Sequence, residues 1–328
     1  MRIKKSLLIV MLLVLLVFSI SFNVRFVARS YSEKKERELL NQTLPYIFPF
    51  FRDMPHEDFV QIKKYYRATF QDLKDEVNMS IILPEGAKYS FYFEALNSGA
   101  YIGTLEKEKF SPASLRKVPM LAALYKKFEN NEVQRTDKVE ILPDDVNTIS
   151  GPLGNRGSGV VLTVDELINY TTYYSDNTAA AALLRVVGKE SYTEAMFNMG
   201  LSYKTFIETM DSPDTPLSAK EYSNVFRSLY YASWLTRISS NELLDKLTKT
   251  GFTDGLPAGV PSNILVSHKT AFWIEKSQHH DCGIIYYPND PYILCIMVLG
   301  LDESSSNRVT AKISKIIYNY MDMAVSAG

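Results

Sequence analysis

The chain is organised around one stretch of sequence, Phe110-Ser-Pro-Ala-Ser-Leu-Arg-Lys-Val-Pro-Met-Leu-Ala-Ala-Leu-Tyr-Lys-Lys-Phe128. Its apolar spacing predicts a helix that begins close to Ser114. Ser114 and Lys117 are three residues apart, so both side chains project from one side of the first turn. A serine hydroxyl becomes a good nucleophile when a nearby base takes its proton, and a buried lysine with a lowered pKa can be that base. The helix start also offers unpaired N–H groups to an anionic intermediate.

A serine followed three residues later by a lysine is a weak signal by itself. The same spacing occurs at Ser32 and Lys35, in a charged stretch without other chemical groups of interest. Taken alone, Ser114 reads as an N-cap serine and Lys117 as a surface lysine. Two further stretches favour the catalytic interpretation.

The second stretch, Tyr173-Tyr-Ser-Asp-Asn-Thr-Ala-Ala180, interrupts two apolar helical runs. Ser, Asp and Asn are turn formers, so a turn between helices is the simplest interpretation. In a catalytic site, Ser175 can relay a proton and Asn177 can donate to a substrate carbonyl. We expect Asp176 to hold the turn together by bonding backbone groups.

The third stretch is Val266-Ser-His-Lys-Thr-Ala-Phe272, which predicts a strand. Lys269 and Ala271 then share one face and Thr270 lies on the other. An edge strand that carries a lysine explains this pattern without any function. The functional alternative is a cation with a hydroxyl beside it, ready to bind a substrate carboxylate. His268 is expected to pack in the sheet.

Composition limits the class of protein. The chain has 328 residues, enough for more than one structural unit and a large core, and a net charge of -1. That charge gives no electrostatic reason to expect nucleic-acid binding. Two cysteines exclude a disulfide scaffold. A predicted hairpin over residues 281–301 places Cys282 and Cys295 on one face, either bridged or as two buried thiols, and we expect thiols.

Residues 1–29 differ from the rest, because a basic start precedes a nearly unbroken apolar run from Leu7 to Phe22. Extension of this run to Val27 would suffice to span a membrane. A cleaved signal peptide is the alternative, but no good cleavage site follows the run. We therefore expect an uncleaved membrane anchor. Basic residues on both sides leave its orientation undecided.

Residues 30–76 are charged and aromatic with helical spacing, and predict a stalk. Their apolar positions recur at three- and four-residue steps, at Phe59, Ile62, Tyr65, Tyr66, Phe70 and Leu73. Such a stripe favours an amphipathic helix packed on the following domain over a helix on a membrane surface.

Residues 77–328 predict one α+β domain. Strands are expected from both ends of this segment, at 89–96, at 101–105 and in the hairpin 281–301, with a closing helix over 309–325. Capping boxes at Thr163 and Ser218, and helix ends at Gly188 and Gly200, indicate helices between them. We expect an antiparallel sheet covered by the first and last helices, with an all-helical lobe inserted at about 111–258. The default place for a site is the cleft between lobe and sheet.

Together, the three polar stretches resemble the motifs of the class A β-lactamase and penicillin-binding-protein superfamily. The resemblance spans about residues 89–325 and includes Thr215-Pro216 and the run Asp254-Gly-Leu-Pro-Ala-Gly259. It implies a serine hydrolase without a cofactor or metal, which forms an acyl-enzyme with a β-lactam or a D-alanyl peptide. We expect a membrane-anchored protein whose catalytic domain acts outside the cytoplasm, or a secreted one if the N-terminus is cleaved.

The resemblance also implies roles for single residues. Ser114 would be the nucleophile, Lys117 its base, and Ser175 the proton donor to the leaving nitrogen. Asn177 would hold the substrate's amide side chain. The substrate carboxylate would bind to Lys269 and Thr270, and the oxyanion to the backbone N–H groups of Ser114 and Phe272.

Two departures from the family pattern bear on activity. The third motif normally ends in glycine, but this chain has Ala271. The glutamate that activates the deacylating water is not identified, and Glu208 and Asp211 are only weak candidates because they read as loop charges or caps. Without that base the acyl-enzyme is long-lived, which favours a D-alanyl-D-alanine peptidase or penicillin-binding behaviour over efficient antibiotic hydrolysis. A non-catalytic penicillin-binding or sensory domain is the alternative.

Other chemistry has less support. His279-His280-Asp281 is a poor metal site because adjacent strand residues point to opposite faces. Residues 154–159 are glycine-rich but lack the strand and helix that flank a phosphate loop. No Gly-x-Ser-x-Gly motif is present, so an α/β-hydrolase is not supported, and there are no internal repeats.

Overall fold

The computed structural model of the protein describes residues 46, 70–201 and 215–326. Its centre is a five-stranded sheet with the order β2-β1-β7-β6-β5, in which every neighbouring pair is antiparallel. The strands are β1 Lys88–Ala95, β2 Ala100–Thr104, β5 Val266–Trp273, β6 Gln278–Ile285 and β7 Tyr292–Leu299. The two N-terminal strands and the three C-terminal strands thus share one sheet, as the sequence predicted.

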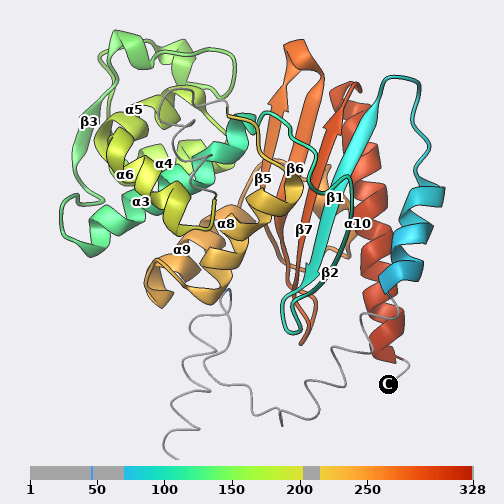
Figure 1. The fold of residues 1–328 in the computed structure, drawn as a ribbon. Coiled ribbons are helices and arrows are strands. Elements are labelled where there is room, and N and C mark those ends of the chain that lie inside the picture. Colours follow the sequence, from blue (N-terminus) through green and yellow to red (C-terminus); the bar gives the residue numbers. More distant parts are fainter. Residues whose placement is uncertain (1–45, 47–69, 202–214, 327–328) are drawn as a thin grey trace, which may run out of the picture. The chain divides into compact units, whose positions relative to one another are not determined.

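One face of the sheet packs against helix α10, Glu303–Ser326, and against the helical residues 70–80 (Figure 1). Alternate residues of β1 and β7, among them Phe93 and Leu294, are fully buried there. The ring of Phe70 meets that of Phe93 edge to face, with 5.0 Å between centroids. Phe70 and Leu73 therefore pack on the domain as predicted, whereas the earlier part of that predicted helix lies outside the described residues.

The opposite face carries the inserted lobe, whose helices are α3 Lys117–Glu129, α4 Val164–Tyr173, α5 Asn177–Val187, α6 Lys189–Asn198, α8 Ala219–Tyr231 and α9 Arg237–Thr248 (Figure 1). Both predicted capping boxes form, because Thr163 and Ser218 each accept a hydrogen bond from the backbone of the residue three positions later. Gly188 ends α5 with a φ of +80°, a left-handed value that favours glycine.

The lobe is not all-helical, and that prediction was wrong. Strands β3, Lys138–Glu140, and β4, Val161–Thr163, pair in a small antiparallel sheet. Each strand buries one apolar side chain, Val139 or Leu162, between more exposed neighbours. A three-residue strand is too short for the alternation that identifies strands in a sequence.

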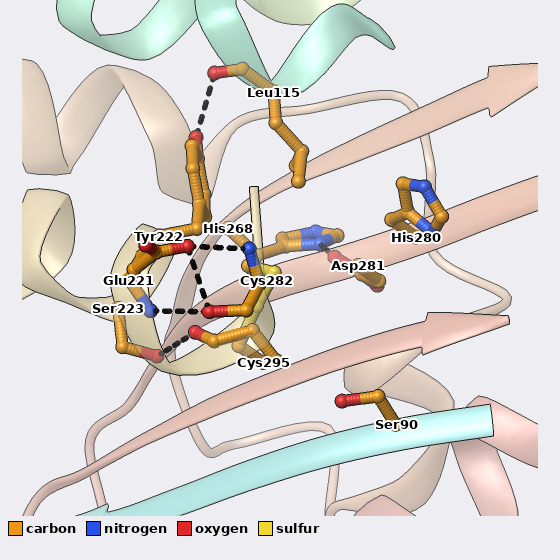
Figure 2. Close-up of a disulfide and its surroundings, with 12 residues drawn as sticks. Ser90, Leu115, Glu221, Tyr222, Ser223, His268, His280, Asp281, Cys282 and Cys295 are labelled. Atoms are coloured by element: carbon orange, nitrogen blue, oxygen red, sulfur yellow. Dashed lines mark hydrogen bonds and ion pairs between the residues drawn. A yellow bond between two sulfur atoms is a disulfide. The ribbon is translucent and has the colours of Figure 1, made fainter. Parts of the chain in front are cut away.

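The two cysteines form a disulfide, so the expectation of free thiols was also wrong (Figure 2). Cys282 of β6 and Cys295 of β7 are direct cross-strand partners, with 3.9 Å between their Cα atoms. The predicted hairpin left open whether they would be paired or diagonal. Direct pairing on one face brings the sulfur atoms within bonding reach.

The predicted anchor at 1–29 and most of the predicted stalk at 30–76 lie outside the described residues. Within the part of the chain that the structure describes, no helix combines the length and apolar character needed to cross a membrane. The anchor therefore stays a prediction from the sequence.

We expect Leu73→Ala to lower the free energy of unfolding by about 2–5 kcal/mol, because it leaves a cavity under the sheet. Leu73 is fully buried, while the neighbouring Asp72 is exposed. The matched control Asp72→Ala should change the value by about 0.5 kcal/mol or less. Urea unfolding of the three proteins is the measurement, and equal effects of the two substitutions would contradict the packing described here.

Candidate active site

Ser114 lies in the 3₁₀ turn η1, Ala113–Arg116, which leads directly into α3 and packs against β5. Ala113 has a φ of +42°, a strained value for a residue with a side chain. Helix α8 holds the turn in place, because Tyr222 Oη donates a hydrogen bond to the Leu115 carbonyl at 2.6 Å. Ser114 is half-buried, and its hydroxyl makes no hydrogen bond to any residue that the structure describes.

Lys117 points from the start of α3 toward the turn between α4 and α5. Its Nζ donates to Ser175 O at 2.5 Å, to Ser175 Oγ at 3.2 Å and to Asn177 Oδ1 at 2.7 Å. Burial, and then the positive charge of Lys269, hold the pKa of Lys117 well below 10.5, while Asp176 opposes the shift. The site therefore favours the neutral amine, which is the form that can accept a proton.

Ser175 is fully buried and has a φ of +52°. Its hydroxyl accepts a second hydrogen bond, from Lys269 Nζ at 2.8 Å. A hydroxyl has one proton to donate and two lone pairs. It can therefore accept from a charged Lys269 and donate to a neutral Lys117 at the same time, which links the two amines by a proton path.

Asp176 fixes the turn that carries Ser175, as predicted. Its Oδ1 accepts from Ala179 N at 2.9 Å as the N-cap of α5, and its Oδ2 accepts from Leu153 N at 2.7 Å. Gly151 makes this approach possible, because a Cβ there would lie 2.2 Å from Asp176 Oδ2.

Asn177 is the first residue of α5. Its Oδ1 accepts from Lys117, and its Nδ2 donates to Asn147 Oδ1 at 3.2 Å. Asn147 thus orients the amide of Asn177. Sequence analysis missed Asn147, since a single polar residue in a loop carries no recognisable signal.

Lys269, on β5, is 1% exposed. Besides Ser175 Oγ, its Nζ donates to Thr270 O at 2.8 Å, and it lies 5.6 Å from the centroid of the Phe252 ring. Burial lowers the pKa of Lys269 to about 7, although Asp281 opposes the shift. Near neutral pH this side chain is therefore poised between charged and neutral, and an incoming anion would favour the charged form.

The rest of the third motif follows along β5, the edge strand of the sheet. Thr270 Oγ1 is buried and has no hydrogen-bond partner within residues 70–201 and 215–322. Ala271 is buried opposite His280, so its methyl group fits within a continuous strand. Phe272 packs near Phe252, with 6.4 Å between ring centroids.

A cavity of about 300 Å³ borders Lys117 and Asn177. Among the described residues, Asp144 and Asp145 also line it, but Asp145 is paired with Arg185 at 2.7 Å. The two carboxylates singled out from the sequence, Glu208 and Asp211, lie outside the described residues.

Two buried histidines of the sheet, His268 and His280, make structural contacts. His268 Nδ1 lies 2.7 Å from Asp281 Oδ1 in the buried sheet, which confirms the predicted packing of His268. His280 Nε2 lies 3.0 Å from Ser111 O, and burial lowers the pKa of His280 to about 4. The neutral ring therefore donates to that carbonyl. No group of three or more metal-ligating side chains occurs among the residues that could be described.

Comparisons of the sequence and of the fold with known proteins identify the family. A model of the β-lactamase enzyme family matches residues 72–321. Beta-lactamase VEB-1 of Pseudomonas aeruginosa is 24% identical over 242 residues, covering 64% of this chain and 78% of that protein. A β-lactamase of Phocaeicola vulgatus is 25% identical over 240 residues, covering 66% and 74%. The structure of PBP-A superposes with a TM-score of 0.69 at 21% identity, covering 77% of this chain and 96% of that one.

The chain belongs to the β-lactamase enzyme family. It is accordingly a serine hydrolase of the β-lactamase-like superfamily.

The buried Lys269 predicts a pH-dependent stability. Its pKa is about 7 in the folded state and 10.5 without burial, so between these values the unfolded chain holds a proton that the folded chain has released. The free energy of unfolding therefore gains a term that rises with pH across this window, by up to about 1.4 kcal/mol per unit of pKa difference. Lys269→Met removes that term, so its stability relative to the wild type should fall as pH rises from 7 to 10.

Urea unfolding at several pH values measures this difference. The control is Lys107→Met, at an exposed position, which should leave the difference constant. A stability difference for Lys269→Met that does not change with pH would contradict the assigned burial of the amine.

Proposed function

We propose that the protein is a serine hydrolase of the class A type that forms an acyl-enzyme on Ser114 with a β-lactam or a D-alanyl peptide amide. The observation that carries this proposal is the pair of buried lysines, Lys117 and Lys269, that share the hydroxyl of Ser175. Such an arrangement costs stability, because two amines are desolvated side by side. Acyl transfer would explain the arrangement, because it requires a neutral amine as the base and a cation for the substrate carboxylate.

In the proposed acylation, neutral Lys117 takes the proton of Ser114 as Oγ attacks the substrate carbonyl carbon. The C–N bond then breaks, and Ser175 passes its proton to the leaving nitrogen while it takes a proton from the protonated Lys117 beside it, which returns Lys117 to the neutral amine. Backbone N–H groups of Ser114 and Phe272 receive the developing oxyanion. The product is an ester on Ser114 and a free amine.

Substrate binding falls to the remaining residues of the three motifs. Lys269 and Thr270 bind the carboxylate that penicillins and D-alanyl peptides share, and Asn177 holds the amide side chain. The position of Lys269 beside Ser175 supports this role, since it brings a cation to the edge of the reacting bond. A variant of PBP-A has been solved as an acyl-enzyme complex with penicillin G.

Deacylation decides between antibiotic hydrolysis and peptidase-like behaviour. The sequence lacks the usual glutamate context, and of the described carboxylates that line the cavity beside Lys117, Asp144 is exposed and Asp145 is paired with Arg185. We therefore propose slow deacylation. A non-catalytic penicillin-binding or sensory domain is the second candidate, and the absence of a hydrogen bond between Lys117 and Ser114 is the observation that favours it.

We further propose that residues 1–29 anchor the protein in a membrane with the catalytic domain outside the cytoplasm. The apolar run and its basic start support the anchor. The disulfide supports an oxidising compartment.

A chromogenic cephalosporin tests the proposed chemistry. We expect one equivalent of colour per protein in a burst, followed by near arrest, because acylation outpaces deacylation. Lys117→Met should slow the burst by about 100-fold or more through loss of the base. The matched control, Lys127→Met, replaces a lysine on the far end of α3 and should leave the burst unchanged. Steady turnover would contradict slow deacylation, and a burst unaffected by Lys117→Met would contradict its role.

A further inference from the structure

A row of directly paired residues crosses four strands of the sheet. Lys269 of β5 is paired with Cys282 of β6, Cys282 with Cys295 of β7, and Cys295 with Tyr92 of β1. Cross-strand partners point to the same face. Lys269 reaches Ser175 of the lobe and Tyr92 lies with Arg227 of α8, so this face is the one under the lobe.

The disulfide at the centre of this row is fully buried between the sheet and α8. Figure 2 shows Tyr222 of α8 and Leu115 of η1 among its surroundings. Tyr222 donates a hydrogen bond to Leu115 O. Helix α8, which covers the disulfide, is therefore connected to the residue that follows Ser114. The disulfide thus lies beneath the nucleophile's turn and beside the strand that carries Lys269.

Lys269 depends on its packing for its position. It makes no ion pair with a residue of the described segments, and its Nζ has two hydrogen-bond acceptors, one of them its own neighbour's carbonyl. The lysine side chain is a flexible four-carbon chain. With so few hydrogen bonds to hold it, the position of Lys269 Nζ follows the position of strand β5. Movement of β6 would therefore be passed to Lys269 through the β5–β6 pairing.

The cross-link joins β6 and β7 covalently at the position directly beside Lys269. Without the bond, only the hydrogen bonds of the strand ladder hold β6 against β7, and among the residues that the structure describes no strand pairs with the outer edge of β5 to resist a shift.

We propose that the Cys282–Cys295 disulfide is a positioning pair for Lys269, which keeps Nζ within reach of Ser175 and of the substrate carboxylate. The inference rests on the proposed function for the identity of that ligand. It assigns the disulfide a role in substrate binding beyond its contribution to stability.

The test compares acylation by penicillin G with acylation by its methyl ester, which lacks the carboxylate charge. In Cys282→Ala/Cys295→Ala, we expect acylation by penicillin G to slow by about 10-fold or more and acylation by the ester to change by about twofold or less. In a Lys269→Ala background, the same double substitution should have no further effect on penicillin G, because both changes act through one amine. Equal slowing of both compounds, or additive effects, would overturn the proposal.

The matched control is Ile284→Val/Ile293→Val. These residues form the next cross-strand pair on the same face, are equally buried, and adjoin Ser267 of β5 in place of Lys269. This control variant should change the rates of acylation by penicillin G and by its methyl ester to the same extent. If the alanine variant does not fold, Cys282→Ala/Cys295→Val restores part of the lost volume and serves in its place.

A titration of Lys269 tests the proposal without any acylation. Carbon-13 NMR of labelled lysine follows its ionisation in wild-type and disulfide-free protein, with Lys269→Arg to assign the signal. The charged groups that interact electrostatically with Lys269 are Asp281 from β6 and Lys117 from α3, and neither of them is altered.

We expect Lys269 to titrate at higher pH once the disulfide is removed, because a displaced amine becomes better hydrated. An unchanged titration would overturn the proposal. If neither penicillin G nor its ester acylates the wild type, the proposed function fails, and this titration alone still decides the role of the disulfide.

Discussion

The site depends on one shared hydroxyl. Ser175 Oγ lies within hydrogen-bonding distance of Lys117 Nζ and Lys269 Nζ, and both amines are buried. Two desolvated amines cannot both remain charged at low cost, so burial and the charge of Lys269 together lower the pKa of Lys117. The hydroxyl between them accepts from both amines, and because it also has a proton of its own, it can turn to donate to Lys117 when that amine is neutral.

The rest of the structure holds this contact in place. Lys117 comes from the first helix of the lobe, Ser175 from a strained turn within it, and Lys269 from the edge strand of the sheet. Asp176 fixes the turn through two backbone bonds, and the close approach of Gly151 permits it. On the sheet side, Lys269, the two cysteines and Tyr92 are direct cross-strand partners. This row of pairs fixes the register of strands β5, β6, β7 and β1 relative to one another.

The sheet, the helices that pack on it and the capping boxes could be predicted from the sequence because each has a local signal. Examples are the alternation of side chains in β1 and the capping box at Ser218. Sequence analysis also identified the residues that the structure brings together at Ser175, since three short polar motifs interrupt otherwise apolar elements. It failed where the signal was too short or non-local. The strands at Val139 and Leu162 each bury a single side chain. The disulfide depends on a register that the sequence did not specify, and Asn147 meets Asn177 across 30 residues of sequence.

The central claim is that this constellation makes Ser114 a nucleophile. Intact-mass spectrometry after incubation with penicillin G tests it most directly, with Ser114→Ala as the matched control. The account predicts one covalent penicillin adduct on the wild type and none on the variant. An adduct that persists in Ser114→Ala, or a wild type that gains no mass, would contradict it.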